Sequence, residues 1–404
     1  MKITLTQFRP NTAEAAWTDC FAQAIAELNK AGGGVLTVPA GEYTTGPIEL
    51  CSNVELHLEA GAVIRFLNDP AAFPLQECQY EGRISHRPKP CLSAYHAENV
   101  ALTGSGVLDG CGAPWWAGQR ARTLANGRPY LLHFEDVTHL RIRGVQLRNS
   151  PAWTVHPLNC VDVLIEDVSI CNPYHSPNTD GINPESCRDV RILGCRVDVG
   201  DDCITLKSGT EETPNPAPCE NIVIANCLLV HGHGGIVIGS EMSGGVRNVT
   251  VTNCVFTGTD RGLRVKTRRR RGGCVENLRL SNLVMERVFC PFVFNMYYSC
   301  GTAEKDRWVW EKTPYPVDGG TPAFRNIRIS GVTVVGATAS AGFFYGLAES
   351  PIDGLSLTDC HIEMARGAAP EKPAMMGNLE PMSARGFFLR NAKNVEFHNV
   401  TLKN

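Results

Sequence analysis

The stretch DVRILGCRV, residues 189–197, carries the pattern that decides the fold. A polar residue comes first, apolar residues then alternate with other residues, and a small or polar turn follows. The pattern returns as NIVIANCLLV at 221–230 and as NVTVTNCVF at 248–256. Further copies lie at 53–58, 99–104, 162–170, 277–285, 326–334, 354–362 and 394–402. Alternation with a period of two is typical of β-strands, so the repeat predicts an all-β fold.

The spacing of the copies indicates which repeat fold they form. From Val163, the first apolar residues of the next copies are Val190, Ile222, Val249 and Leu278, which gives steps of 27, 32, 27 and 29 residues. These steps are too long for a leucine-rich repeat. Each contains several strand-sized pieces and no helical period. We therefore expect each step to form one coil of a right-handed parallel β-helix, with its core made by stacking coils.

Residues 1–50 differ from the repeats and predict a cap at the N-terminal end. Thr18 is a favourable helix N-cap, and three glycines from Gly32 end the helical pattern. Three apolar residues share one helical face: Phe21, Ile25 and Leu28. No linker rich in Pro, Gly or Ser separates a second domain. We therefore expect a single β-helix domain over 1–404, with a capping helix in its first 50 residues.

Bulk composition excludes several classes of protein. The chain has 404 residues, a formal net charge of −3 and no apolar run long enough to span a membrane, so neither nucleic acid nor a membrane is an expected partner. The N-terminal sequence shows no apolar leader, and the expected location is the cytoplasm. The 17 cysteines are then interpreted as reduced thiols. Four lie five residues after the reference position of their coil, which predicts an inward ladder: Cys195, Cys227, Cys254 and Cys360.

Aligning a second strand of each coil brings charged residues into register. The aligned segments are DGINPES, DCITLKS, GGIVIGS and GLRVKT, which begin at residues 180, 202, 234 and 262. In this register three carboxylates and one imidazole are expected at one turn of neighbouring coils: Asp180, Asp201, Asp202 and His233. Because Val265 points inward by strict alternation, Arg264 and Lys266 point outward beside the acids.

Four short motifs in the chain resemble the signatures of the polygalacturonase (pectinase) family of glycoside hydrolases, family 28. They are NTDG at 178–181, GDD at 200–202, GHG at 232–234 and RVK at 264–266, in the order in which the family has them. One departure is Val265, where the family usually has isoleucine. Since this position faces the core, the change is expected only to reduce side-chain volume. The resemblance spans most of the chain and favours an exo-acting bacterial type.

The resemblance implies an inverting hydrolase that needs no metal and no cofactor. By carry-over Asp201 is the general acid, and Asp180 and Asp202 hold the attacking water. His233 is then expected near Asp201, and Arg264 with Lys266 is expected to bind a substrate carboxylate. Crowding three carboxyl groups also favours keeping one of them protonated. The alternative for each residue is a structural role in an acidic turn or a solvated strand face.

Further subsite candidates are Asn178, Asn183, Lys207, Tyr297 and Tyr298. Asn178 belongs to the NTDG motif, and Asn183 and Lys207 face outward by the same alternation. The two tyrosines follow on the next coil, where either one contacts the sugar or both pack a turn. The basic run at 268–271 either attracts an anionic sugar chain or is a solvated loop.

The expected substrate is a pectic oligosaccharide with α-1,4-linked galacturonate. Long insertions at 65–95, 111–130 and 299–323 favour closure of one end of the groove and exo action, which also suits short oligomers inside a cell. Three alternatives remain open: a related hydrolase of rhamnogalacturonan or of unsaturated oligogalacturonides, a calcium-dependent pectate lyase, and a glycan-binding β-helix without activity. The oligomeric state is left open.

Overall fold

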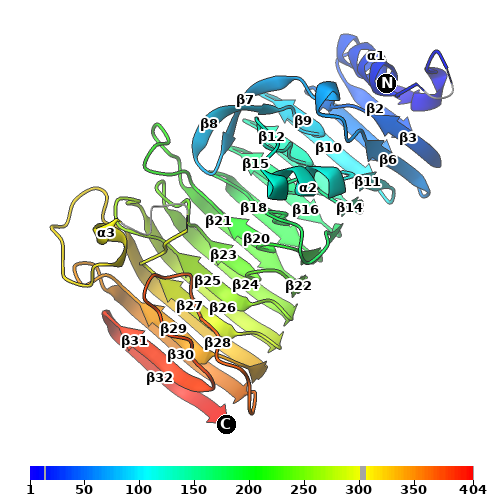
Figure 1. Ribbon diagram of the computed structural model, residues 1–404. Coiled ribbons are helices and arrows are strands. Elements are labelled where there is room, and N and C mark those ends of the chain that lie inside the picture. Colours follow the sequence, from blue (N-terminus) through cyan, green and yellow to red (C-terminus); the bar gives the residue numbers. More distant parts are fainter. Residues whose placement is uncertain (13–14, 301–305, 404) are drawn as a thin grey trace. The chain divides into compact units, whose positions relative to one another are not determined.

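In the computed structural model the chain forms two compact units of parallel β-strands. Unit 1 comprises Met1–Tyr80 and Ile84–Asp201, and unit 2 comprises Glu81–Arg83 and Asp202–Asn404. The structure describes residues 1–12, 15–300 and 306–403. Figure 1 shows successive coils of strands stacked side by side within each unit. The predicted fold class, a right-handed parallel β-helix, is confirmed. The expectation of a single domain stays a prediction.

Three rows of parallel strands make unit 1. The first row is β1 (Lys2–Thr4), β2 (Gly34–Val38), β5 (Val54–Leu58), β10 (Glu98–Gly104), β13 (Thr138–Arg143), β16 (Val161–Glu166) and β18 (Arg188–Leu193). The second is β3 (Gly41–Thr45), β6 (Ala62–Phe66), β11 (Val107–Asp109), β14 (Gln146–Arg148), β17 (Ser169–Cys171) and β19 (Arg196–Val199). The third is β4 (Ile48–Leu50), β9 (Leu92–Tyr95), β12 (Leu132–Glu135) and β15 (Val155–Leu158).

Unit 2 has longer strands, several of which bend across two rows. These are β21 (Cys219–Ala225), β24 (Val246–Thr257), β26 (Cys274–Glu286), β28 (Ala323–Ala337), β30 (Ile352–Met364) and β32 (Ala392–Lys403), with β22 (Leu228–His231) paired to the end of β24. The other row is β20 (Ile204–Leu206), β23 (Ile236–Ile238), β25 (Arg261–Lys266), β27 (Cys290–Asn295), β29 (Ser340–Tyr345) and β31 (Arg385–Arg390).

The polar residue that opens each sequence copy makes the turn between strands. Asn221, Asn248, Asn277 and Asn326 all have left-handed backbone conformations, with φ between 53° and 59°. Asparagine tolerates this region because its short amide can hydrogen-bond locally. The side chains also bond from coil to coil, with Asn248 Nδ2 donating to Asn221 Oδ1 at 3.0 Å and Asn277 Nδ2 donating to Asn248 Oδ1 at 3.0 Å. Stacked asparagines therefore fix the turns while the apolar positions fill the core.

The inward cysteines are buried as predicted. Each thiol donates to the carbonyl oxygen two residues earlier, as in Cys227 to Ala225 at 3.3 Å and Cys254 to Thr252 at 3.2 Å. Cys195 and Cys360 repeat the contact at 3.5 Å. The hydrogen bond with Cys227 and burial together raise the pKa of Cys254. The cysteine ladder is therefore confirmed as a core feature.

The N-terminal helix α1 (Thr18–Lys30) packs with the first strands of unit 1. Phe21, Ile25 and Leu28 are buried, as the helical periodicity predicted. The predicted cap is wrong, because Trp17 occupies the N-cap position and Thr18 begins the helix. The Thr18 hydroxyl accepts instead from the amide of Gly46 at 2.7 Å, so the threonine fastens the helix to a strand turn.

Several excursions leave the coils. The strands β7 (Leu75–Tyr80) and β8 (Arg83–Pro88) form a separate two-stranded sheet, and the short helices are η1 (Leu5–Gln7), η2 (Pro70–Ala72), α2 (Ala113–Ala121) and α3 (Arg307–Trp310). Trp115 and Trp116 of α2 are buried, so they form a loop core. Residues 301–305 of the predicted insertion at 299–323 lie outside the described residues. Within the described ranges, no helix combines the length and apolarity needed to cross a bilayer.

Candidate active site

A buried ion cluster in unit 2 joins two of the motifs. Arg264 Nη1 donates to Asp202 Oδ1 at 2.9 Å, and Lys266 Nζ donates to Asp202 Oδ2 at 2.8 Å. The two cations lie on β25, with the buried core residue Val265 between them. The side chains of Asp202, Arg264 and Lys266 are only 2%, 3% and 8% exposed, so the alternative of a solvated strand face does not hold.

This cluster keeps Asp202 ionised. Burial by itself would raise the pKa of the carboxyl group, because the charged form loses its hydration. The charges of Lys266 and Arg264, together with the hydrogen bond from Lys266, outweigh burial and hold the pKa of Asp202 well below its usual range. A permanently charged carboxylate can accept a proton-bearing water but cannot act as a general acid near neutral pH.

The GHG motif reaches the same cluster. A Cβ added at Gly234 would lie 2.5 Å from Val237 Cγ2 and 3.2 Å from Asp202 Oδ1, so only glycine fits this close approach. The carbonyl of Gly234 also accepts from the amide of Cys203 at 2.8 Å. The register that placed GDD, GHG and RVK on neighbouring coils therefore holds for Asp202, Gly234 and the two cations.

His233 is oriented by a carboxylate that the sequence analysis missed. Its Nδ1 lies 2.8 Å from Asp260 Oδ2, and Arg261 Nη1 donates to the same oxygen at 3.2 Å. The His233 side chain is 47% exposed, so the ring is accessible to a ligand. The signal for Asp260 was present, because it follows Val249 by eleven residues, the offset that also gives Asp201 after Val190 and His233 after Ile222.

A late loop, residues 365–384, also covers the cluster and was missed. Arg264 Nη2 contacts Met375 Sδ at 2.9 Å, and the buried Arg261 donates to the carbonyls of Lys372 and Pro373 at 2.9 Å each. This loop lies between β30 and β31, where the sequence shows neither the repeat nor a motif. Its landing place was therefore not readable from periodicity.

The structure distinguishes the two tyrosines. The ring of Tyr298 lies 5.3 Å from Lys266 Nζ, which places Tyr298 beside the cluster. Tyr297 contacts other residues, with Lys312 Nζ 3.4 Å from its ring and Tyr345 at 5.0 Å. Burial raises the pKa of Tyr297 to about 12 and that of Tyr298 well above its ordinary value. Both hydroxyls therefore stay protonated at neutral pH.

The remaining acids belong to unit 1. Asp180 is buried and its carbonyl accepts from the amide of Thr154 at 2.8 Å. Asn178 Oδ1 accepts from Arg128 Nη2 at 2.7 Å, and the buried Arg128 also donates to the carbonyl of Pro151. Asp201 is the last residue of this unit. That Asp180 and Asp201 meet Asp202 and His233 at one turn stays a prediction.

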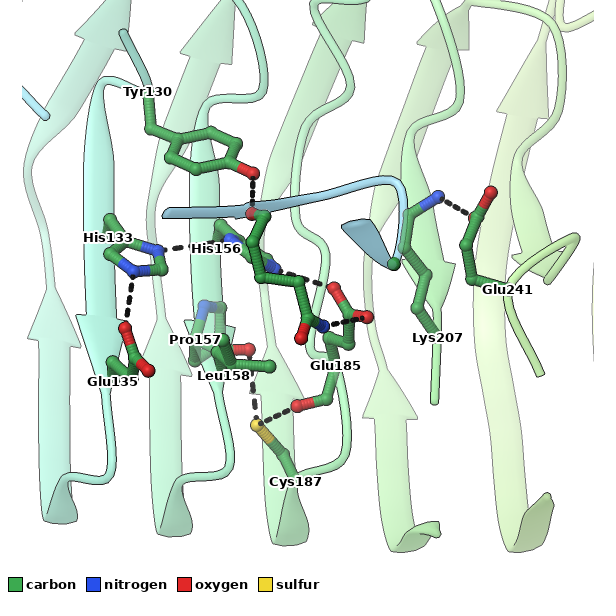
Figure 2. Close-up of polar contacts among 12 residues, drawn as sticks. Tyr130, His133, Glu135, His156, Pro157, Leu158, Glu185, Cys187, Lys207 and Glu241 are labelled. Atoms are coloured by element: carbon green, nitrogen blue, oxygen red, sulfur yellow. Dashed lines mark hydrogen bonds and ion pairs between the residues drawn. The ribbon is translucent and has the colours of Figure 1, made fainter. Parts of the chain in front are cut away.

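The outward candidates Asn183 and Lys207 are both buried. Lys207 Nζ donates to Glu241 Oε2 at 2.7 Å, as Figure 2 shows, and the charge of Lys207 outweighs burial in holding the pKa of Glu241 well below its usual range. The amide of Asn183 makes no hydrogen bond to another described residue. Neither side chain lies on an open face.

A buried histidine pair in unit 1 was also missed. His133 Nδ1 and His156 Nδ1 lie 3.0 Å apart, His156 Nε2 is 3.0 Å from Glu185 Oε2, and His133 Nε2 is 3.4 Å from Glu135 Oε2 (Figure 2). Ionised carboxylates only accept, so three hydrogen bonds require three N–H protons on the two rings. Two neutral imidazoles carry two. The pair therefore holds one positive charge, and its hydrogen bond lowers the pKa of Glu135 against the effect of burial.

The basic run at 268–271 is largely internal. Arg268, Arg269 and Arg271 are buried, whereas Arg270 is exposed. Arg269 forms a bidentate pair with Glu349, and Arg268 and Arg271 share Glu211. The alternative of a solvated loop therefore does not hold for three of the four arginines.

No group of three or more His, Cys, Asp or Glu side chains within 1–12, 15–300 and 306–403 is arranged to hold a metal ion. The parallel β-helix and the buried Asp202, Arg264 and Lys266 cluster are features of a β-helical, carbohydrate-active enzyme. This is a class and not yet a family.

Comparison with known proteins defines the family. The profile of glycosyl hydrolases family 28 matches residues 32–364. A probable polygalacturonase of Vitis vinifera is 31% identical over 363 residues, covering 87% of this chain and 72% of that protein. An endo-polygalacturonase of Pectobacterium carotovorum subsp. carotovorum is 31% identical over 291 residues, covering 67% and 70%. The crystal structure of a hyperthermoactive exopolygalacturonase from Thermotoga maritima superposes with a TM-score of 0.82 at 30% identity, covering 100% of this chain and 92% of that one. The chain belongs to glycosyl hydrolases family 28 and is a glycoside hydrolase.

Proposed function

We propose that this enzyme hydrolyses α-1,4-linked galacturonate in pectic oligosaccharides, from one chain end and with inversion. The observation that carries the proposal is the Asp202 carboxylate, held ionised between Arg264 and Lys266 on one strand face. The cluster has two cations for one anion, and such a surplus favours a substrate that brings a carboxylate of its own. The similar proteins named above are polygalacturonases of both endo and exo types.

Each residue has a role in the proposed reaction. Asp201 protonates the glycosidic oxygen as the bond to the anomeric carbon breaks. Asp180 and Asp202 hold a water on the opposite side of the sugar, remove its proton and direct its oxygen to that carbon, which inverts the configuration. Asp260 orients His233, and His233 in turn positions the acid.

Arg264 and Lys266 have a double role in this proposal. They keep Asp202 ionised in the free enzyme and bind the carboxylate of the sugar next to the scissile bond. The Tyr298 ring beside Lys266 offers that sugar an apolar surface. Asn178, Asn183, Lys207 and Tyr297 are more distant in role. Their contacts with Arg128, Glu241 and Lys312 favour support of the groove over direct contact with the substrate.

The proposed exo action and location have separate support. The Thermotoga maritima protein is an exopolygalacturonase, and it is similar to this chain along its full length. For the location we propose the cytoplasm. Its support is the number of core thiols, such as Cys195, Cys254 and Cys360, because a reducing compartment preserves unpaired cysteines. Fractionation of cells that produce the protein tests the location.

Product analysis tests the reaction. The purified protein is incubated with tri- and tetragalacturonate, with and without chelator, while anomeric protons are followed by NMR. The expected result is release of single galacturonates of inverted configuration, unaffected by chelator and lost in Asp201→Asn. The matched control is Asp198→Asn, because Asp198 lies three residues upstream in an ion pair with the half-exposed Arg196. A mixture of internal products would instead indicate endo action, and retained configuration would overturn the mechanism.

A further inference from the structure

A second polar cavity lies beside the Asp202 cluster, within unit 2. Its volume is about 170 Å³, on the order of one sugar ring rather than a chain. Tyr298 lines this cavity and also lies 5.3 Å from Lys266 Nζ, so the two sites share a wall. The hydroxyls of Thr210 and Ser240 line it as well. A ligand bound over Lys266 can therefore continue into the cavity.

The tip of the β7–β8 hairpin closes one side of the cavity. Glu81 and Gly82 have φ of 51° and 76°, which is the geometry of a type I′ two-residue turn. The carbonyl of Gly82 accepts from the hydroxyls of Thr210 at 3.3 Å and Thr213 at 2.9 Å. Arg83 makes a bidentate pair with Glu212 at 2.9 Å and 3.1 Å. These contacts fix a wall where an extended polysaccharide would otherwise continue.

The buried charges around the cavity are unequal. Arg268 and Arg271 have side chains only 7% and 4% exposed, and they share one carboxylate, Glu211. Lys207 and Glu241 form a separate buried pair. Three buried cations therefore face two carboxylates, and the Nε atoms of both arginines lack hydrogen-bond partners among the described residues. Since a buried charge is costly unless paired, this surplus favours an anionic ligand.

We propose that this cavity is a closed end subsite that binds the terminal uronate of the substrate, with the carboxylate of that sugar on Arg268 and Arg271. The inference rests on the proposed function and deepens it. The hairpin tip ends the groove, Tyr298 packs against the sugar ring, and Thr210 with Ser240 bonds to its hydroxyls. Exo action then follows from the wall, because a chain enters only until its last sugar fills the cavity.

Cys300 provides a direct probe of occupancy. Its side chain is exposed and lines the cavity. The unmodified protein is alkylated with iodoacetamide, and the rate at Cys300 is followed by mass spectrometry of its peptide. Galacturonate at saturating concentration is expected to slow this rate at least fivefold, while galactose, the neutral analogue, leaves it unchanged. Cys171, an exposed thiol of unit 1, is the internal control and reacts at one rate throughout. Equal rates with and without galacturonate would overturn the proposal.

Two neighbouring arginines form a matched pair of variants. Arg271→Gln removes a cavity guanidinium, whereas Arg270→Gln removes the same charge from an exposed side chain that packs on Trp308 at 4.4 Å. The first variant should abolish galacturonate protection of Cys300 and raise KM for digalacturonate at least tenfold, with kcat within threefold. The second should change neither. Protection that survives in Arg271→Gln would refute the proposed carboxylate contact. If this variant fails to fold, the alkylation assay on the unmodified protein still decides.

The two proposals fail separately. Cleavage of oligogalacturonides without galacturonate protection of Cys300 would refute the end subsite and leave the proposed function standing. Protection without cleavage of any galacturonate oligomer would refute the proposed function and support the uronate-binding cavity.

Discussion

Replacing Asp202 with asparagine is expected to destabilise unit 2 strongly. Asp202 accepts one charge-assisted hydrogen bond from Arg264 and one from Lys266, each contributing about 1.5–3 kcal/mol. An asparagine amide offers one acceptor oxygen and turns its NH₂ toward a cation, so one bond is lost and two buried charges remain unpaired. We therefore expect a loss of about 3–5 kcal/mol in the free energy of unfolding, the range for breaking a buried ion pair.

Urea denaturation at pH 7, followed by circular dichroism, measures this loss. Asp198→Asn is the control, because its ion pair with Arg196 is half-exposed and should cost below about 1 kcal/mol. Adding Lys266→Met to Asp202→Asn should recover part of the loss, since it removes one unpaired cation. A cost for Asp202→Asn no larger than that of Asp198→Asn, without recovery in the double variant, would refute the reasoning.

The same variant tests the sign of the pH dependence. A depressed pKa means that the folded state binds the proton of Asp202 less readily than the unfolded chain does. The stabilisation is therefore present above the unfolded pKa of about 3.9 and is lost as pH falls through the lower folded pKa. Unfolding between pH 5 and pH 2 should show a shallower acid decline for Asp202→Asn than for the unmodified protein. Parallel declines would mean that Asp202 is not held ionised.

Three further predictions concern other contacts. Asp260→Asn should lower kcat on trigalacturonate between about 10- and 100-fold by misorienting His233, with KM within twofold; an unchanged kcat would rule out this orienting role. Gly82→Ala should cost more than about 1 kcal/mol and speed hydrogen exchange at 81–83, because its φ is +76° and a Cβ would lie 2.1 Å from Thr210 Cγ2. Glu185→Gln should lower stability by about 3 kcal/mol in thermal unfolding, since the buried histidine pair loses an anion; a neutral effect would refute its positive charge.

The repeats were predictable because they follow from local chemistry. Alternation, left-handed asparagines and one inward position per coil give strand, turn and register together, as the asparagines from Asn221 to Asn277 and the buried cysteines confirm. The same register placed Arg264 and Lys266 together. Their partner was not foreseen, because the resemblance assigned both cations to the substrate and gave no reason to pair them with Asp202.

What the sequence did not reveal are contacts made by segments that leave the repeat. The loop at 365–384 reaches Arg264 through Met375, and a hydrophobic residue in an irregular segment carries no signal of where it lands. The histidine pair was missed for a different reason. His133 and His156 lie 23 residues apart without any metal spacing, and only the strand pairing of β12 with β15 shows that they are neighbours.

The pairing of β26 with β28 bears on how such enzymes acquire new specificities. Leu278 pairs with Ile327, 49 residues later, where other coils take 27 to 32, yet the two strands stay in phase over their full length. Some twenty extra residues have thus been added at one bend without disturbing a single rung. A scaffold of this kind can exchange its overhanging segments like interchangeable tools, so the chemistry on the strands is inherited while the selection of substrates is rewritten in the loops.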